Sequence, residues 1–535
     1  MPVPSSRLAV RIAVPCLLTA ALGYAACGTP SYRYAAAPPR YAIVAVGPIE
    51  RPAPGMNTEA YDRITDNPFL AARDNPLSTF SIDVDTASYA NVRRFLHDEH
   101  LPPADAVRIE EMVNYFHYAY PPPEGAAPIA VTTEVGPCAW NAEHRLVRIG
   151  LRARSMVHGQ APARNLTFLI DVSGSMDEPK KLPLLKRSLA LLADQLEERD
   201  RIAIVVYAGA SGVVLPPTSG AARERISDAL ASLQAGGSTN GAAGIELAYQ
   251  LAEQSLVRGG VNRVGINRVI LATDGDFNVG VTSQGDLVRL IEEKRKSGIA
   301  LTVLGFGMGN LKDSTMEKLA DKGNGNYAYI DSLAEARKVL VEEAAGTLVT
   351  VASDVKIQVE MNPVEIESYR LIGYENRVLR KEEFDDDGAD AGEMGAGQTV
   401  TAFYEVAPAR RGRAAAAPAA LRYQANAALT EAARGGELMT LKVRYKLPGE
   451  SQSELASWPV RDRGRVGLDA TSRDFRFASA VVAFGLSLRA SPHRGQATFA
   501  LAKSLAAEAL APDADEHRRE LVALVGTAQA LAAKQ

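Results

Sequence analysis

Cysteine is scarce in this chain, which has three cysteines among 535 residues. Two of them, Cys16 and Cys27, lie in the first thirty residues, so only Cys138 remains in the body of the protein. A single thiol cannot form an internal disulfide, and a lone thiol in an exported chain is most simply a small buried hydrophobic residue. A disulfide-stabilised fold is therefore excluded.

An excess of charge of either sign is also absent. The chain has 59 basic and 63 acidic residues and a formal net charge of -4. Nothing in this balance requires nucleic acid or an anionic membrane surface, and we expect no nucleic acid partner. The composition, 47% hydrophobic and 23% charged, is that of a soluble globular protein. At this length we expect two or three domains.

A long hydrophobic run is missing as well. The longest uncharged apolar segment, residues 12–26, follows Arg7 and Arg11 and is too short for a comfortable transmembrane span. It is typical of a secretory signal. It ends in GYAACG, where small residues precede Cys27.

This ending resembles the lipobox of bacterial lipoproteins, whose cysteine becomes the acylated first residue. Tyr24 stands where that motif prefers leucine, and simple cleavage after an A-x-A-like site is the alternative. The resemblance implies a signal peptide over residues 1–27, lipid on Cys27 and a membrane partner reached through that lipid. Gly28 is not the aspartate that retains many lipoproteins at the inner membrane. We therefore expect a protein exported to the cell envelope, in the outer membrane facing the periplasm or the surface.

Composition and periodicity divide the rest of the chain. Residues 28–67 are rich in Pro and Ala and are predicted to be a disordered tether. Residues 68–128 contain apolar residues at helical spacing and are predicted to be mostly helical. The residues with this spacing are Tyr89, Val92, Phe95 and Leu96, then Ile109, Met112, Val113 and Phe116.

The middle of the chain alternates apolar runs with amphipathic segments. Over residues 165–346 the runs LTFLI, RIAIVVYA, RVILAT, IALTVLGFG and NYAYID each precede a helical pattern. This alternation predicts an α/β domain, a doubly wound and mainly parallel sheet covered on both faces. Ligands of such sheets bind at the carboxyl ends of the strands.

Strand patterns lie on both sides of this domain. Residues 129–160 and 350–460 alternate apolar and polar residues between turn signals, which indicates a β-sandwich. We expect both stretches to form one sandwich with the α/β domain inserted in it. Residues 470–535 are predicted to be helical, so that small helical N-terminal and C-terminal units flank the sandwich.

Oxygen-bearing side chains follow the α/β strands. LIDVSGSMDEPK places Asp171, Ser173 and Ser175 two residues apart, so that their side chains can project to one side of a turn. AGGSTNG supplies Thr239, and ILATDGDFNVG supplies Asp274 directly after a strand, while Asp276 can cap the next turn. Carboxylates and hydroxyls without nitrogen or sulfur select Mg²⁺, with Mn²⁺ or Ca²⁺ as alternatives, over Zn²⁺ or Cu²⁺.

This set resembles the metal-ion-dependent adhesion site (MIDAS) of von Willebrand factor type A domains. D-x-S-x-S, a later loop threonine and a strand-end TDG all match, and the resemblance implies a Rossmann-like fold. It implies five ligands, direct or through water: Asp171, Ser173, Ser175, Thr239 and Asp274. Two carboxylates and three hydroxyls leave one position of a six-coordinate ion for an outside oxygen, best an Asp or Glu of a partner protein.

The resemblance extends to both sides of this domain. STFSIDVDTASYANVRRFL with EEMVNYF, and EEFDDDGADAGEMGAGQTVTAFYEV, are similar to the amino-terminal region and the carboxyl-terminal domain of unknown function of bacterial lipoproteins with a central type A domain. The function that follows is a non-enzymatic, adhesion-type binding protein of the envelope. The alternatives are a scaffold or chaperone-like factor for a metal-dependent enzyme complex and, less favoured, a metal-dependent hydrolase; no histidine lies in the metal loops.

Three other patterns have functional and structural interpretations. Asp83 and Asp85 in DVDT resemble the nucleophile loop of haloacid dehalogenase-type phosphatases, but a strand end with Asp85 or Thr86 capping the next helix is favoured. His97, His100 and His117 are candidates for zinc but are better explained as solvated. The run from Asp385 resembles a calcium loop but is better explained as a solvated turn.

Overall fold

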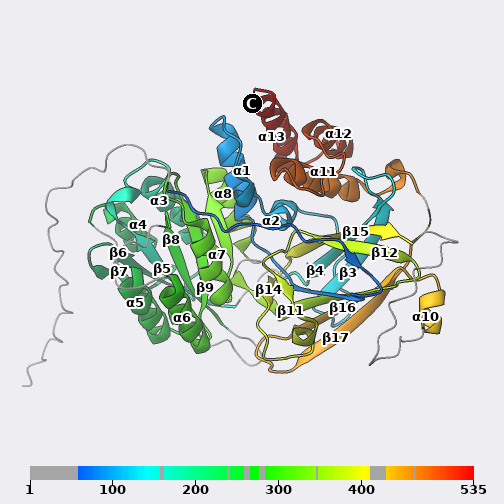
Figure 1. The fold of residues 1–535 in the computed structure, drawn as a ribbon. Helices are drawn as coiled ribbons and strands as arrows, with labels where there is room; N and C mark the ends of the chain where they lie inside the picture. Colours follow the sequence, from blue (N-terminus) through cyan, green and yellow to red (C-terminus); the bar gives the residue numbers. More distant parts are fainter. Residues whose placement is uncertain are drawn as a thin grey trace, which may run out of the picture. The chain divides into compact units, whose positions relative to one another are not determined.

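The computed structural model describes residues 58–156, 162–237, 241–257, 265–275, 284–344, 348–409, 429–462, 464 and 466–534. All of them belong to one compact unit, Val46–Gln535. Three sheets organise this part of the chain, and helices pack on them (Figure 1).

A six-stranded sheet in the order β10-β9-β8-β5-β6-β7 forms the middle of the chain. Its pairs are parallel except for β6 and β7, which are antiparallel. The predicted doubly wound, mainly parallel sheet is confirmed. The strands are β5 (Arg164–Asp171), β6 (Arg201–Tyr207), β7 (Ser211–Ser219), β8 (Ile266–Thr273), β9 (Ala300–Phe306) and β10 (Tyr327–Ile330).

Helices cover both faces of this sheet (Figure 1). In β5, Phe168 packs in one core with α3, α4 and α8, whereas Leu169 packs in another with α5, α6 and α7. Since both faces are buried, the strand must be apolar throughout, as LTFLI is. The helices are α3 (Leu182–Ala193), α4 (Arg223–Ser232), α5 (Gly241–Gln254), α6 (Gln284–Lys294), α7 (Asp313–Lys322) and α8 (Leu333–Arg337), which a π-helical turn over Lys338–Glu342 follows.

The strand order reverses at β5, which lies between β6 and β8. The chain passes from β5 to β6 and only later reaches β8 on the other side. Such a switch point leaves a crevice at the carboxyl ends of the two strands. Asp171 ends β5 and Asp274 follows the end of β8, so the fold places both at this crevice.

Two antiparallel sheets pack face to face as a sandwich around one core. In the first, β4 pairs with β3 and with β15, so strands from both sides of the α/β domain share one sheet, as expected. The first sheet contains β1 (Leu70–Ala71), β12 (Ile366–Ile372), β15 (Thr399–Pro408), β4 (Arg145–Ala153) and β3 (Ile129–Pro137). The second contains β13 (Val378–Leu379), β2 (Leu77–Ser81), β11 (Thr350–Met361), β16 (Met439–Lys446) and β17 (Ser453–Val460), and β14 (Gly392–Gly395) pairs with β11.

The two helical units expected at the ends of the chain form one layer. Tyr89 and Met112 share a hydrophobic core with Phe477, Val481 and Leu524, and Cys138 is buried in the same core. Each C-terminal helix begins at a side-chain cap, such as Ser472, which accepts a hydrogen bond from the Phe475 N–H. The helices are α1 (Ala87–His97), α2 (Ile109–Asn114), α11 (Arg473–Leu488), α12 (Phe499–Ala509) and α13 (Glu516–Ala532); the short α10 (Glu431–Arg434) lies apart in the sequence.

The beginning of the described chain differs from the prediction. The tether was expected to reach residue 67, but Glu59 and Arg94, each with 4% of its side chain exposed, form an ion pair at 2.8 Å. Ala60 bridges to Lys312 of the α/β domain. The segment expected to be mostly helical also supplies β1 and β2 to the sandwich. Polar partners in distant parts of the sequence order this segment, and local composition does not reveal them.

No helix in the described ranges is both long and apolar enough to cross a lipid bilayer. The predicted signal and Cys27 lie outside the described residues.

Candidate metal centre

The loop after β5 gathers three of the predicted ligands. Asp171 is fully buried, and its Oδ1 accepts the backbone N–H of Ser173 at 2.9 Å. This bond bends the chain into a short 3₁₀ turn over Gly174–Met176. The turn brings Ser173 Oγ to 3.0 Å from Ser175 Oγ. One carboxylate and two hydroxyls therefore lie together, as the spacing of the motif predicts.

Thr273 connects this loop to the end of β8. Its hydroxyl donates to Asp171 Oδ2 at 2.9 Å and accepts the N–H of Gly275, also at 2.9 Å. Gly275 has a φ of +89°, a conformation that glycine adopts at little cost. Asp274 lies between these two residues and is fully buried. The sequence did not identify Thr273, which is the direct link between two of the ligand loops.

The two aspartates affect each other electrostatically. Burial, together with the neighbouring charge of Asp274, raises the pKa of the Asp171 carboxyl to about 6. Two ionised carboxylates buried near one another need positive charge, and Lys181, 3.2 Å from Asp274, offsets only one of them. A hard divalent cation would supply the rest and would bind carboxylate and hydroxyl oxygens, so the residues present fit a Mg²⁺-type ion.

The loop that carries Thr239 is described only in part. Thr239 lies outside the described residues, and so does Asp276. The two residues that precede the loop are held against the first loop, because Gly236 donates its N–H to the Val172 carbonyl at 2.7 Å and Gly237 accepts from the Gly174 N–H at 3.2 Å. These bonds place Gly236 and Gly237 against the loop that carries Asp171.

Two further residues hold Asp274, and sequence reasoning missed both. Lys181 Nζ lies 3.2 Å from Asp274 Oδ2, and Asn310 Nδ2 donates to the same oxygen at 2.8 Å. Lys181 directly precedes α3 and is 2% exposed. Since the N-terminus of a helix disfavours a cation, a lysine there is the signal that could have revealed it. Lys181 and Asn310 are positioning residues for Asp274.

Histidine does not contribute to a metal site in the described chain. No group of three or more His, Cys, Asp or Glu residues in the described ranges is arranged to hold a metal ion. His97 lies 3.7 Å from Glu520 and His117 lies 3.2 Å from Glu343, so these histidines belong to separate ion pairs. The described structure therefore does not bring these histidines together, and a centre built partly from hydroxyls does not depend on such a group.

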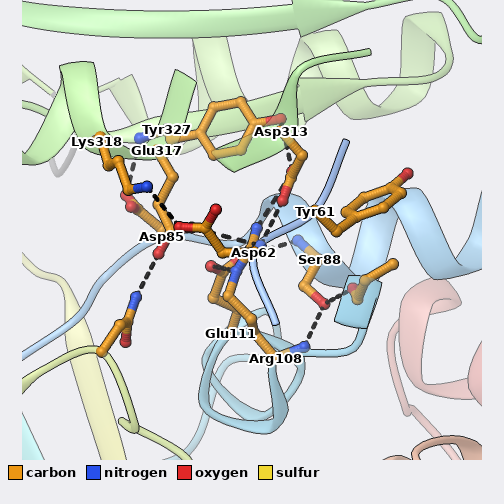
Figure 2. Close-up of polar contacts among 12 residues, drawn as sticks. Tyr61, Asp62, Asp85, Ser88, Arg108, Glu111, Asp313, Glu317, Lys318 and Tyr327 are labelled. Carbon is orange, nitrogen blue, oxygen red and sulfur yellow. Dashed lines mark hydrogen bonds and ion pairs between the residues drawn. The ribbon is translucent and has the colours of Figure 1, made fainter. Parts of the chain in front are cut away.

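The phosphatase interpretation of Asp83 and Asp85 is also wrong. β2, which precedes them, is antiparallel to β11, so no parallel α/β core surrounds the motif. Asp85 does not cap α1 either: its Oδ1 accepts the backbone N–H of Tyr327, at the start of β10, at 2.8 Å (Figure 2). Thr86 precedes α1 without a side-chain cap.

The acidic run after Phe384 is a turn held by one bond within the turn and by an ion pair to β16. Asp385 pairs with Arg444 at 2.6 Å, and Asp386 accepts the N–H of Gly388 at 2.8 Å. These bonds favour the solvated turn over a calcium loop.

Three protein families match consecutive parts of the chain. The family "von Willebrand factor type A domain" matches residues 165–343, "von Willebrand factor" matches residues 55–148, and "Uncharacterized protein YfbK, C-terminal" matches residues 346–531. The chain is 43% identical over 475 residues to "Uncharacterized protein YfbK" of Escherichia coli (strain K12), a match that covers 88% of this chain and 80% of that protein.

More distant similarities are confined to parts of the chain or are weak. Human inter-alpha-trypsin inhibitor heavy chain H4 is 26% identical over 233 residues, which cover 42% of this chain and 25% of that protein. A solved structure, "von Willebrand factor type A from Catenulispora acidiphila", is 17% identical and has a TM-score of 0.41, covering 71% of this chain and 86% of that one. The extensive match to YfbK and the type A domain at its centre show that the chain belongs to the YfbK family of bacterial von Willebrand factor type A domain proteins.

Proposed function

We propose that this chain is a non-enzymatic, metal-dependent protein-binding protein of the bacterial cell envelope. The observation that carries the proposal is the placement of Asp171 and Asp274, both fully buried, at the carboxyl ends of adjacent strands, with the hydroxyls of Ser173 and Ser175 beside them. Membership of the type A domain family, in which protein interaction and adhesion are common roles, supports it.

The residues that would hold the metal are Asp171, Ser173, Ser175, Thr239 and Asp274. The ion, Mg²⁺ with Mn²⁺ or Ca²⁺ as alternatives, would supply a positive centre that can accept an outside oxygen. The chain's own residues orient the site: Thr273 fixes Asp171, while Lys181 and Asn310 fix one oxygen of Asp274. Lys181 also adds a positive charge, so the loaded site favours an anionic partner group, an Asp or Glu of a protein ligand.

Partner capture tests this function. Envelope proteins are captured on the immobilised chain in Mg²⁺ and in EDTA, with wild type and Asp171→Ala in parallel. A partner retained only by wild type in Mg²⁺ supports the proposal. Equal capture in EDTA and by the variant would favour the alternative of a scaffold or chaperone-like factor. Turnover of generic phosphoesters would favour the alternative of a metal-dependent hydrolase.

Ser173 and Ser175 are hydrogen-bonded to each other, and no histidine bonds to either of them in the described chain. The carboxylate beside them, Asp171, is assigned to the metal in this proposal, so neither hydroxyl has a base reserved for it. This arrangement supports a non-enzymatic role.

The lipid anchor leads to a prediction of its own. If Cys27 is acylated, Cys27→Ser should move the exported protein from the membrane fraction to the soluble fraction, because two or more acyl chains supply most of the membrane affinity. Fractionation of cells followed by immunoblotting measures this, with Cys16→Ser as the control inside the signal. A Cys27→Ser protein that remains wholly in the membrane fraction would contradict lipid attachment there.

A further inference from the structure

The candidate metal centre contains a buried cation that belongs to the chain itself. Lys181 is 2% exposed, and its Nζ lies 3.2 Å from Oδ2 of the fully buried Asp274. The same ammonium donates to Oδ1 of Asn310 at 3.1 Å. The amide of Asn310 in turn donates to Asp274 Oδ2 at 2.8 Å, so the three side chains form a closed triangle of hydrogen bonds. A metal ion that approaches this oxygen must therefore compete with an ammonium that the chain already places there.

The end of β9 is shaped to admit this lysine. Gly307 directly follows β9 and has a φ of +76°, a conformation that glycine adopts at little cost. A Cβ at this position would overlap Cγ, Cδ and Cε of Lys181, so the aliphatic chain runs through space that only a glycine leaves. Tyr329 fixes this glycine, because its hydroxyl donates to the Gly307 carbonyl at 2.5 Å. The fold therefore holds the ammonium in one place.

This position is unfavourable for a lysine unless a carboxylate compensates for it. Lys181 precedes α3, where the helix dipole disfavours a cation, and a buried ammonium is costly unless it is paired. Glu178 is a second acidic neighbour, with its Oε1 3.5 Å from Nζ, but 56% of its side chain is exposed and solvent screens its charge. The buried carboxylate of Asp274 is therefore the main partner of the ammonium.

The charges at the centre determine how strongly it attracts a metal ion. When ionised, Asp171 and Asp274 carry two negative charges, and Lys181 offsets one of them. The affinity of such sites for hard cations depends on the number of charged ligands, and a positive charge a few ångströms from a divalent ion opposes its binding. We propose that Lys181 sets the affinity of this centre: it weakens metal binding and stabilises the buried aspartates in the metal-free protein. The inference rests on the proposed function, because it requires the ion to bind at these two aspartates.

The other described contact to Asp274 should survive replacement of Lys181. Asn310 lies in a loop that the segment before β1 holds on both sides. Two backbone hydrogen bonds do this, from the Thr58 N–H to the Gly309 carbonyl at 2.7 Å and from the Ala60 N–H to the Leu311 carbonyl at 2.9 Å. Asn310 should therefore keep its bond to Asp274 in Lys181→Met, and the main change is the loss of one positive charge.

Calorimetric titration of Mg²⁺ into the metal-free full chain tests the proposal. Lys181→Met should bind Mg²⁺ at least tenfold more tightly than wild type, which corresponds to about 1.4 kcal/mol. A residue that only positioned Asp274 would have the opposite effect, because its loss would weaken binding. The sign of the change therefore separates an effect of charge from a merely structural role.

Two matched variants control for the charge. Lys180→Met removes the same charge from the neighbouring position, where 53% of the side chain is exposed, and should leave the Kd within about twofold of wild type because solvent and salt screen it. Lys181→Arg keeps the charge and should bind Mg²⁺ no more tightly than wild type. Tightening by Lys181→Arg equal to that by Lys181→Met would contradict the proposal.

Urea unfolding supplies a second measurement. In EDTA, Lys181→Met should have a lower midpoint than wild type, because it leaves the buried Asp274 without its cation. Saturating Mg²⁺ should then raise the midpoint of the variant more than that of wild type. If the variant is unfolded in EDTA, its folding is titrated with Mg²⁺ instead: folding below the wild-type Kd supports the inference, and a variant still unfolded in Mg²⁺ that saturates wild type contradicts it.

The same titrations distinguish failure of this inference from failure of the proposed function. If wild type binds Mg²⁺ and Lys181→Met binds it equally or more weakly, the affinity-setting role of Lys181 is wrong and the metal centre stands. If neither protein binds Mg²⁺, Mn²⁺ or Ca²⁺ at millimolar concentration, the metal centre and this inference are both wrong.

Discussion

Asp171→Asn should abolish the stabilisation of the chain by Mg²⁺. A ligand that binds only the folded state at 100 times its Kd adds about 2.7 kcal/mol to the free energy of unfolding. Wild type should gain this amount, and the variant should gain nothing, because it lacks one of the two carboxylates that hold the ion. Without Mg²⁺ the variant should be at least as stable as wild type, since the amide removes one of two neighbouring buried charges.

Urea unfolding followed by circular dichroism, after EDTA treatment and with or without excess Mg²⁺, measures both effects. Asp228→Asn, at an exposed position of α4, is the matched control and should respond to Mg²⁺ as wild type does. A Mg²⁺ response that survives in Asp171→Asn would rule out the proposed ligand set. A variant much less stable than wild type in EDTA would instead show that Asp171 serves mainly the fold, through its bonds to Ser173 and Thr273.

Arg108→Met should cost about 3–5 kcal/mol of folding free energy, the range for breaking a buried ion pair from one side. Arg108 pairs with Glu111 and Asp313 and lies 3.5 Å from Glu317 (Figure 2). Methionine keeps much of the side chain's length but leaves these carboxylates buried without their cation. Burial already raises the pKa of Glu317 to about 7 despite Arg108, so loss of the arginine should raise it further.

The comparison for this variant is Arg380→Met, which removes an arginine paired with Glu383 at an exposed site. Its urea midpoint should stay close to that of wild type, because exposed pairs contribute little. Arg108 joins Glu111, in the segment before the α/β domain, to Asp313 and Glu317 of α7. If Arg108→Met costs less than about 1 kcal/mol, this ion-pair network is not a significant source of stability.

Local patterns in the sequence predict much of the fold and most of the described residues of the candidate metal centre. The sequence predicts buried strands such as β5 because a strand buried on both faces needs apolar side chains throughout. It also predicts the first loop of the site, because the spacing of Asp171, Ser173 and Ser175 brings them to one side of a turn. Asp274 follows a strand end, and the parallel sheet brings that end next to Asp171.

The remaining features depend on contacts between segments distant in the sequence. Lys181 reaches Asp274 across 93 positions and Asp85 reaches Tyr327 across 242. The residues near Asp85 look the same whether it caps the next helix or accepts a hydrogen bond from a distant strand. The prediction of a helix cap was therefore wrong. The order of residues 58–67 was missed for the same reason, since Glu59 is paired with Arg94 and not with a near neighbour.

The single helical layer built from both ends of the described chain bears on biosynthesis. Arg93 of α1 and Glu520 of α13 are 427 residues apart and form an ion pair at 3.4 Å, and α1 and α2 share their core with α11. These early helices therefore stay without their main apolar neighbours until α11 has been synthesised. A premature stop codon before α11 would leave their apolar faces uncovered, and the truncated product should aggregate.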